Sequence, residues 1–260
     1  MKKYKNVIDY YNNATDDYKY WSKEYNMHFG LAIFNVFNRE KMLKKMNSYV
    51  LEKSGFYNKG KNNFIDLGCG CGATLRQGCK EERGKKITGV TLSDWQINKC
   101  QEICNKQKIE NATVLNEDYH NLPFQDEQFD GGYALESICH SENREQVIKE
   151  ASRVLKKGSE FVINDGFMKI DTSKGSKFFK KTYSAMCEGW AIPNFANIEE
   201  FKKTLERNNF KIKEIEDLSW KVAPTALHSP FVISKYLLFA LLGKAPLQKQ
   251  NLNNLKGSFM

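Results

Sequence analysis

A glycine-rich loop, Asp66-Leu67-Gly68-Cys69-Gly70-Cys71-Gly72, carries the clearest chemical signal in the chain. It follows an apolar run typical of a strand and precedes a run with helical spacing. Glycines at such a junction permit a tight turn and let the backbone approach a ligand at the helix N-terminus. The spacing alone is compatible with a nicotinamide or flavin dinucleotide, or with a purely structural turn.

Three features favour S-adenosylmethionine over a dinucleotide. Asp66 places a carboxylate beside the glycines, which suits an amino-acid ammonium group and would repel a pyrophosphate. Ala73 stands where the dinucleotide pattern has its last glycine. Finally, Asp118 and Tyr119 follow a later β-type run, where the acid can accept a hydrogen bond from an adenine amine while the ring of the tyrosine covers the base.

The elements that must position these residues alternate between β-type and helical runs over residues 62–165, which predicts a parallel sheet with helices on both faces. The expected strands are 64–67, 87–90, 113–115, 129–135 and 161–164, and the expected helices are 73–79, 95–106 and 143–155. Lys156-Lys157-Gly158 is expected to end the last of these helices, with basic side chains and a glycine cap. A further helix is expected at 198–208 and a sixth strand at 210–215. The expected fold is a Rossmann-like, mainly parallel sheet of seven strands, six of which are assigned to residues here.

On these residues, 62–165 resembles the core of the class I S-adenosylmethionine-dependent methyltransferases. The resemblance implies S-adenosylmethionine as cofactor and S-adenosylhomocysteine as product. It assigns the methionine and ribose portion to Asp66 and the loop glycines, and adenine to Asp118 and Tyr119. The residues expected to bind the cofactor are Asp66, Gly68, Cys69, Gly70, Gly72, Thr91, Leu92, Gln96, Asp118, Tyr119 and Leu135, with the cysteine side chains serving mainly as small packing groups.

The second strand departs from the common pattern, because many members of this class place an acid at its end and this chain has Gly89-Val90-Thr91-Leu92-Ser93. Together with Gln96, this run resembles the cyclopropane fatty acid synthase and small-molecule methyltransferase branch. The resemblance implies that Thr91, Leu92 and Gln96 line the ribose by polar contact. Ser93 and Gln96 also fit a capping box at a helix start, and both interpretations can hold together.

Aromatic residues crowd the segment before this core, between residues 17 and 30. The run resembles the Tyr-x-x-Trp and His-Phe segment of the sterol and tocopherol C-methyltransferases, and Tyr10 to Tyr18 matches that group too. The resemblance implies an acceptor-binding role for Tyr18, Tyr20, Trp21, Tyr25 and His28. An aromatic ring face beside a methyl sulfonium or a carbocation would stabilise positive charge by about 0.5–2 kcal/mol. The alternative is a hydrophobic staple that holds an N-terminal helix on the core.

Glu136 and His140 follow the fourth expected strand and place a carboxylate and an imidazole at the carboxyl edge of the sheet, where open α/β folds bind ligands. The run Glu136-Ser-Ile-Cys-His140 also resembles a segment of the sterol methyltransferases. Attack by an alkene carbon on a methyl group leaves a cation that must lose a proton. Glu136 could stabilise that cation, and either Glu136 or His140 could take the proton. The alternative for His140 is a helix cap or a satisfied core histidine.

Composition sets wider limits. The 260 residues carry 40 Lys and Arg against 31 Asp and Glu, a net charge of +9, which favours contact with phosphates, anionic lipid or nucleic acid. The chain has seven cysteines, an odd number, and their spacing matches no zinc-ligand pattern. We therefore expect reduced thiols, no metal site and a cytoplasmic protein. No RNA-binding module is recognisable, so no nucleic-acid partner is expected.

The expected organisation is one methyltransferase domain with additions. Residues 1–56 are predicted to form an aromatic-rich helical lid, and residues 57–260 the Rossmann-like domain with an inserted cover at 166–195. The segment 228–260 is basic and partly apolar, and its apolar stretch 231–242 is too short to span a bilayer. Part of it, 230–249, is either a lid over the acceptor or a peripheral membrane contact.

Together these features predict an S-adenosylmethionine-dependent methyltransferase that acts on a lipophilic small molecule. The preferred acceptor is an isoprenoid, sterol-like or unsaturated lipid methylated at carbon. The alternatives are an amine or hydroxyl acceptor and, with less support, RNA. The oligomeric state is left open by the sequence.

Overall fold

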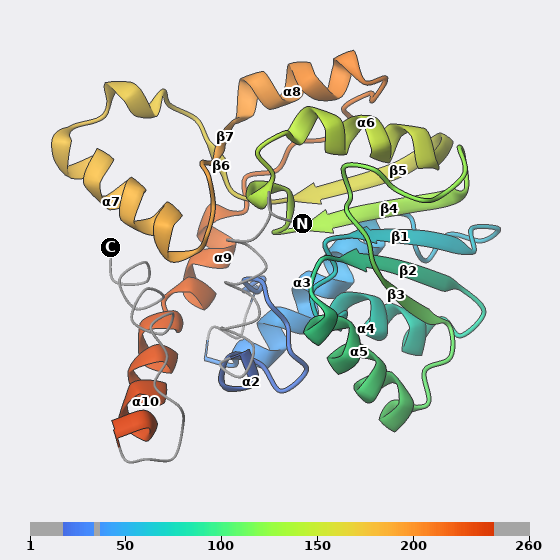
Figure 1. Cartoon of the computed structure of the whole chain (residues 1–260), viewed down its shortest axis with the longest axis horizontal. Coiled ribbons are helices and arrows are strands. Elements are labelled where there is room, and N and C mark those ends of the chain that lie inside the picture. Colours follow the sequence, from blue (N-terminus) through green and yellow to red (C-terminus); the bar gives the residue numbers. More distant parts are fainter. Residues whose placement is uncertain (1–17, 34–36, 242–260) are drawn as a thin grey trace.

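The computed structural model describes residues 18–33 and 37–241. The matches noted between Tyr10 and Asp16, and the end of the tail from residue 242, lie outside this range. Within it, the main body is a parallel sheet with helices on both faces, and the N-terminal segment, the cover and the last two helices lie around its carboxyl edge (Figure 1).

The central sheet has five parallel strands in the order β3-β2-β1-β4-β5. Their bounds are Asn63–Leu67 (β1), Lys86–Thr91 (β2), Ala112–Asn116 (β3), Phe129–Leu135 (β4) and Leu155–Asn164 (β5). The chain order reverses between β1 and β4, so the loops after these two strands diverge and leave a crevice at their carboxyl ends. The glycine-rich loop follows β1, and Glu136 follows β4.

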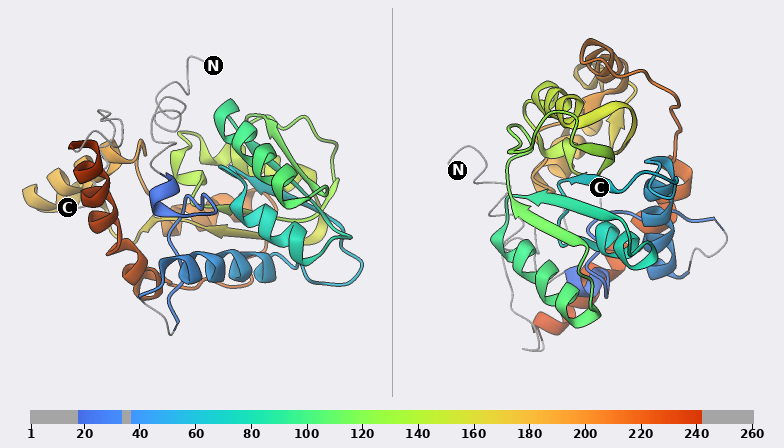
Figure 2. Two further views of the ribbon diagram at one scale, coloured as in Figure 1. Left: turned by 90° about the horizontal axis from the view of Figure 1, so that it is seen from below. Right: turned by 90° about the vertical axis from the view of Figure 1, so that its right-hand side faces the viewer.

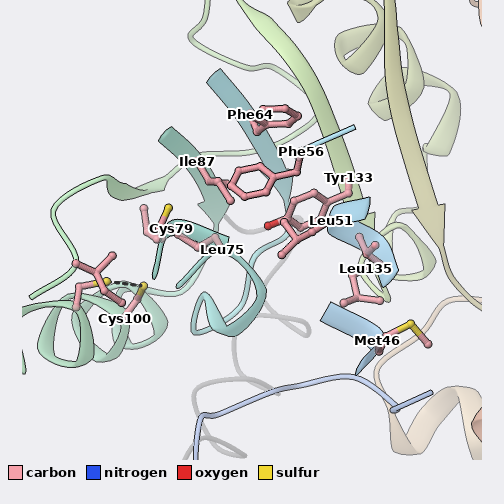
Figure 3. Packing of buried hydrophobic residues seen from close by; sticks show 14 of the residues in the cluster. Met46, Leu51, Phe56, Phe64, Leu75, Cys79, Ile87, Cys100, Tyr133 and Leu135 are labelled. Carbon is pink, nitrogen blue, oxygen red and sulfur yellow. Dashed lines mark hydrogen bonds between the residues drawn. The ribbon is translucent and has the colours of Figure 1, made fainter. Parts of the chain in front are cut away.

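Helices α4 (Ala73–Glu81), α5 (Asp94–Gln107) and α3 (Arg39–Lys53) cover one face, and α6 (Arg144–Val154) and α8 (Ile198–Arg207) cover the other (Figures 1 and 2). Each face has its own apolar core. The first gathers Leu51, Phe56 and Leu75 around the strands (Figure 3), and the second gathers Val147 and Phe201. Burial on both faces explains the consecutive apolar residues at the centre of the sheet, such as Phe64-Ile65 in β1 and Tyr133-Ala134-Leu135 in β4.

Side-chain caps fix where the helices begin. Ser93 accepts a hydrogen bond from the backbone N–H of Gln96 at the start of α5, and Asn143 does the same for Gln146 at the start of α6. Such caps satisfy backbone donors that the helix itself leaves without partners. They also fix the direction in which each helix leaves the carboxyl edge of the sheet.

Two sequence expectations about the sheet are wrong. The helix predicted for 143–155 ends at Val154, and Lys156-Lys157-Gly158 belongs to β5, where Gly158 (φ +77°) lies in an irregular stretch of the pairing with β4. The sheet also has five strands rather than seven. Residues 210–215 form no strand, because their backbone does not pair with β5. Side chains hold this segment near β5 instead: Phe210 stacks on Phe161, and Lys213 pairs with Glu160.

The remaining described elements lie beyond the carboxyl edge. In the N-terminal segment, α2 (Tyr18–Trp21) precedes α3. In the predicted cover, β6 (Phe167–Met168) pairs with β7 (Ala196–Asn197), and α7 (Lys177–Gly189) lies between them in sequence. Two short 3-10 turns, η3 (Ile138–His140) and η4 (Thr172–Lys174), and the helices α9 (Ser219–Ala226) and α10 (Ser229–Leu241) complete the set. No helix among the described residues has the length and apolarity needed to cross a membrane.

Candidate active site

The glycine-rich loop adopts a backbone that other residues would strain. Gly68, Gly70 and Gly72 all have positive φ, at +84°, +53° and +70°. A Cβ on Gly68 would lie 2.4 Å from the Cβ of Ser137, so the loop after β1 packs directly against the loop after β4. The N–H groups of Gly68 and Cys69 donate to the carbonyl of Val90, which fixes the loop on β2.

One pocket is lined by all of the predicted cofactor-binding residues except Gly72, which instead begins α4. Its lining brings together the loops after β1, β2, β3 and β4. The sequence therefore identified residues that the fold gathers from four separate loops. Their individual roles toward a ligand stay predictions.

Asp66 is the buried acid of this pocket. Its side chain is almost fully covered, with 3% of its surface exposed, and burial raises the pKa of its carboxyl to about 8. A carboxylate in such a place is stabilised by a cationic ligand, and an amino-acid ammonium group supplies that charge.

Gln96 is buried against the same pocket. Its Oε1 accepts a hydrogen bond from the Thr91 hydroxyl, and its Nε2 lies 3.5 Å from the Sδ of Met27. Ser93 caps α5 by accepting from the Gln96 N–H, so the capping interpretation is right for Ser93. The Gln96 side chain lines the pocket. Its predicted contact with the ribose of the cofactor therefore stays a prediction.

Segment 22–30 contributes Tyr25, Met27 and His28 to the pocket lining, and a residue that the sequence analysis missed holds it in place. Arg76 of α4 is 1% exposed, and its guanidinium donates to the carbonyl and carboxylate of Glu24 and to the carbonyl of Cys71. It therefore ties this segment to the glycine-rich loop. Arg76 lies on the buried stripe of α4 beside Leu75 and Cys79, and a charge on such a stripe was the available signal.

Glu136 has a left-handed backbone (φ +48°), and its Oε1 accepts a hydrogen bond of 2.9 Å from the N–H of Phe29 in segment 22–30. Burial raises the pKa of its carboxyl to about 8, and the nearby charge of Asp165 acts in the same direction. The sequence analysis missed Asp165, which follows β5 and accepts from the backbone N–H of Cys139. Two carboxylates thus lie close to each other at this edge of the sheet.

The His140 side chain is partly buried, and this burial lowers the pKa of its imidazole. Its Nδ1 lies 3.2 Å from the carbonyl oxygen of Ala191. A carbonyl only accepts hydrogen bonds, so Nδ1 must carry the proton and Nε2 the lone pair of the neutral ring. This tautomer makes Nε2 the basic atom.

A second, much larger cavity of about 1450 Å³ extends from this point along β5 toward α9 and α10. Near Glu136 its walls are aromatic: Phe29 lies between Trp21 (6.0 Å between ring centroids) and Trp190 (5.8 Å). Met27, His28, Glu136 and His140 line both cavities, so the two meet at the predicted catalytic pair.

The five predicted acceptor residues divide between the two cavities. Tyr18, Tyr20, Trp21 and His28 line the larger one. Tyr25 lines only the smaller pocket and lies beside Trp95, with 6.2 Å between the ring centroids. His28 is buried and hydrogen-bonded through Nε2 to Asn47, so it also anchors segment 22–30 on α3.

Comparison with known proteins matches the central part of the chain to a family. Residues 65–163 match the family model described as a methyltransferase domain. The chain is 27% identical over 219 residues to a sterol 24-C-methyltransferase of Schizosaccharomyces pombe, which covers 83% of this chain but 56% of that enzyme. The chain thus spans little more than half the length of this relative.

Two solved structures share the fold. The cyclopropane synthase MmaA2 from Mycobacterium tuberculosis superposes with a TM-score of 0.83 at 14% identity, over 98% of this chain and 90% of that one. A geranyl diphosphate methyltransferase, solved with geranyl diphosphate and sinefungin, gives a TM-score of 0.75 at 15% identity, over 100% and 95%. Residues 65–163 are therefore a methyltransferase domain, and the chain shares its fold with these two enzymes.

Proposed function

We propose that this chain transfers the methyl group of S-adenosylmethionine to a carbon atom of an uncharged, lipophilic acceptor of the isoprenoid, sterol-like or unsaturated lipid class. The observation that carries the proposal is the meeting of the two cavities at Glu136 and His140. One cavity has the buried acid and the glycine-rich loop that suit the cofactor, and the other has aromatic side chains where it meets Glu136.

When bound, the cofactor supplies a methyl group on a positively charged sulfur. The chain has to align the acceptor carbon with that methyl group and exclude water. An attacking alkene carbon leaves positive charge on the acceptor, and two features favour that charge. The rings of Trp21, Phe29 and Trp190 present π-electrons, and Glu136 places a carboxyl group beside them.

Loss of a proton completes the reaction, and two groups could accept it. The Nε2 atom of His140 has the lone pair, and Glu136 has a pKa raised to about 8 that makes its carboxylate a stronger base than usual. Phe29 N–H donates to Glu136 Oε1 and holds the carboxyl group in one orientation. We assign cation stabilisation to Glu136 and leave the proton acceptor to be decided between these two side chains.

The charges along the cavity support a neutral acceptor. Three lysines that line it pair with carboxylates: Lys53 with Glu214, Lys169 with Asp217, and Lys213 with Glu160. A diphosphate would have to displace these partners. The named activity of the Schizosaccharomyces pombe relative, sterol 24-C-methylation, agrees with a lipophilic acceptor.

A membrane surface is the natural source of such an acceptor, and we include peripheral membrane contact in the proposal. On α10, Val232 lines the large cavity while Phe231 and Leu238 are exposed. Helix α7 exposes Phe178 among Lys177 and other lysines, and both helices lie at the end of the molecule away from the sheet (Figures 1 and 2). Exposed apolar side chains with basic neighbours suit an anionic lipid surface.

The deciding experiment incubates the protein with radiolabelled S-adenosylmethionine and separate acceptor fractions: sterols and isoprenoids, unsaturated phospholipids, small amines, small phenols and RNA. We expect label in a neutral lipid fraction, on carbon, and loss of that label in Glu136→Gln. Label in the amine, phenol or RNA fraction alone would overturn the proposal.

Membrane contact is tested by sedimentation with vesicles of neutral phosphatidylcholine, with and without anionic phosphatidylserine. We expect binding to anionic vesicles that weakens with salt and with Phe231→Asp. The control Ile170→Asp changes an exposed apolar residue outside α7 and α10 and should bind normally. Equal binding of Phe231→Asp and the unmodified protein would remove this part of the proposal.

A further inference from the structure

His120 lies just after the two residues predicted to hold adenine and lines neither cavity. Its imidazole Nδ1 lies 2.6 Å from Asp118 Oδ1, and its backbone N–H donates to the same oxygen at 2.9 Å. Two donors from one residue therefore fix the Asp118 carboxylate in a single orientation. The sequence analysis singled out Asp118 but gave His120 no role.

The hydrogen bonds continue beyond Asp118. A carboxylate only accepts, so the His120 Nδ1 carries a proton and donates to Asp118. On the other side of the ring the Ser141 hydroxyl lies 2.8 Å from Nε2, and Ser141 Oγ accepts from the backbone N–H of Asn143 at 3.0 Å. The result is a connected chain from the start of α6 to Asp118.

The rest of His120 is equally constrained. Gln146 of α6 donates to its backbone carbonyl at 2.9 Å, and the ring of Tyr119 lies 4.9 Å from its imidazole. Tyr119 itself donates to the carbonyl of Ser137 at 3.2 Å. Both predicted adenine residues are thus tied to residues 137–141, the loop that also carries His140.

We propose that His120 is a positioning residue that orients Asp118 toward the exocyclic amine of adenine, and that Ser141 holds the other side of its imidazole ring in place. The inference rests on the proposed function, since it needs an adenosyl cofactor in the small pocket. A carboxylate held in place by fixed donors loses little freedom when the ligand binds, so the contact discriminates strongly against a base that lacks the amine.

The test measures binding alone and needs no knowledge of the acceptor. Calorimetry compares S-adenosylhomocysteine with S-inosylhomocysteine, in which a carbonyl replaces the exocyclic amine. For the unmodified protein we expect a preference of about 10- to 100-fold for the adenosyl ligand, the range of a charge-assisted hydrogen bond. In His120→Ala we expect this preference to fall below about threefold, because Asp118 is no longer oriented.

Matched variants separate positioning from general stability. His120→Asn keeps a donor near the Nδ1 position and should retain most of the preference, while Ser141→Ala should reduce it to an intermediate value and serves as the test if His120→Ala does not fold. Val147→Ala, in the buried core beside α6, should lower the unfolding temperature without changing the preference.

A folded His120→Ala with an unchanged preference would overturn the inference while leaving the proposed function intact. So would a loss in His120→Asn as large as that in His120→Ala. If the unmodified protein binds neither ligand, the proposed function fails and the inference fails with it.

Discussion

The two cavities that meet at Glu136 are built from different kinds of segment. The small pocket is made by loops that directly follow neighbouring parallel strands, and hydrogen bonds to Val90, Ser137 and Ser141 hold those loops. The large cavity is made by segments far apart in the chain, from α2 to α10, which meet through aromatic contacts and ion pairs between side chains. We therefore expect cofactor recognition to be set mainly by the sheet edge, and acceptor recognition by the segments added around it.

The largest expected effect lies where the cavities meet. Glu136→Gln keeps the size of the side chain and an oxygen that can accept from the Phe29 N–H, but removes the charge. We expect single-turnover methyl transfer to slow by about a hundredfold or more, with affinity for S-adenosylmethionine changed less than about threefold. Glu142→Gln, an exposed neighbour, is the control. A near-normal chemical step in Glu136→Gln would contradict cation stabilisation by this residue.

The pH dependence of that step sharpens the same point. The carboxyl of Glu136 has a pKa of about 8, so at neutral pH the larger fraction is protonated and lacks the charge that a cation needs. We therefore expect the single-turnover rate to rise between about pH 7 and pH 9 and then level off. Glu136→Gln should lose this rise. A rate that falls over this range in the unmodified protein would count against an ionised Glu136.

A smaller effect, confined to the cofactor side, is expected at Gly68. In Gly68→Ala the new Cβ would meet Ser137 at 2.4 Å on a backbone with φ +84°, which should weaken S-adenosylmethionine binding by roughly ten- to a hundredfold. Gly158→Ala is the matched control, since its φ is +77° but no atom lies within 4 Å of a Cβ built there. It should cost stability without affecting cofactor affinity, and equal binding defects in both variants would show that strain alone is responsible.

The contrast between the cavities also explains what the sequence could predict. Asp66, Gln96 and Asp118 were found because each belongs to a local motif next to a strand or a helix start. Arg76 and Asp165 were missed because their roles depend on contacts with residues that are distant in sequence, Glu24 and Cys139. The five strands of the central sheet were predicted from apolar runs. The prediction of seven strands was wrong, because an apolar pattern such as that of residues 210–215 does not show whether the backbone of another strand lies close enough to pair with it.

Proton release on cofactor binding is expected at Asp66. Its carboxyl, with a pKa of about 8, is largely protonated at pH 7 in the free pocket, and a cationic ligand would favour the ionised form. Calorimetry in buffers of different ionisation enthalpy should show release of up to about one proton per S-adenosylmethionine. Asp66→Asn should abolish this release. Binding without any proton release in the unmodified protein would contradict an ammonium group beside Asp66.

The same pKa fixes the sign of a stability effect. A carboxyl group whose pKa is raised on folding stabilises the folded chain when protonated, and this contribution is lost as the pH rises from about 4 through about 8. The free protein should therefore unfold at a lower temperature at pH 8.5 than at pH 6. The difference should shrink in Asp66→Asn and in the presence of saturating S-adenosylmethionine, because the ligand compensates the buried charge.

The smallest effects, and the most direct test of the contrast, are expected from two aromatic residues that line different cavities. Trp190 contacts Phe29 in the large cavity, whereas Tyr25 lines the small pocket beside Trp95. Trp190→Ala should raise the acceptor KM by about three- to tenfold and leave cofactor affinity unchanged, since the lost contact is with the acceptor side alone. Tyr25→Asn, which tolerates the left-handed backbone at φ +56°, should do the reverse. The acceptor KM and the cofactor affinity should be measured for both variants. If either variant changes both quantities equally, segment 22–30 joins the two cavities into one functional unit instead of separating them.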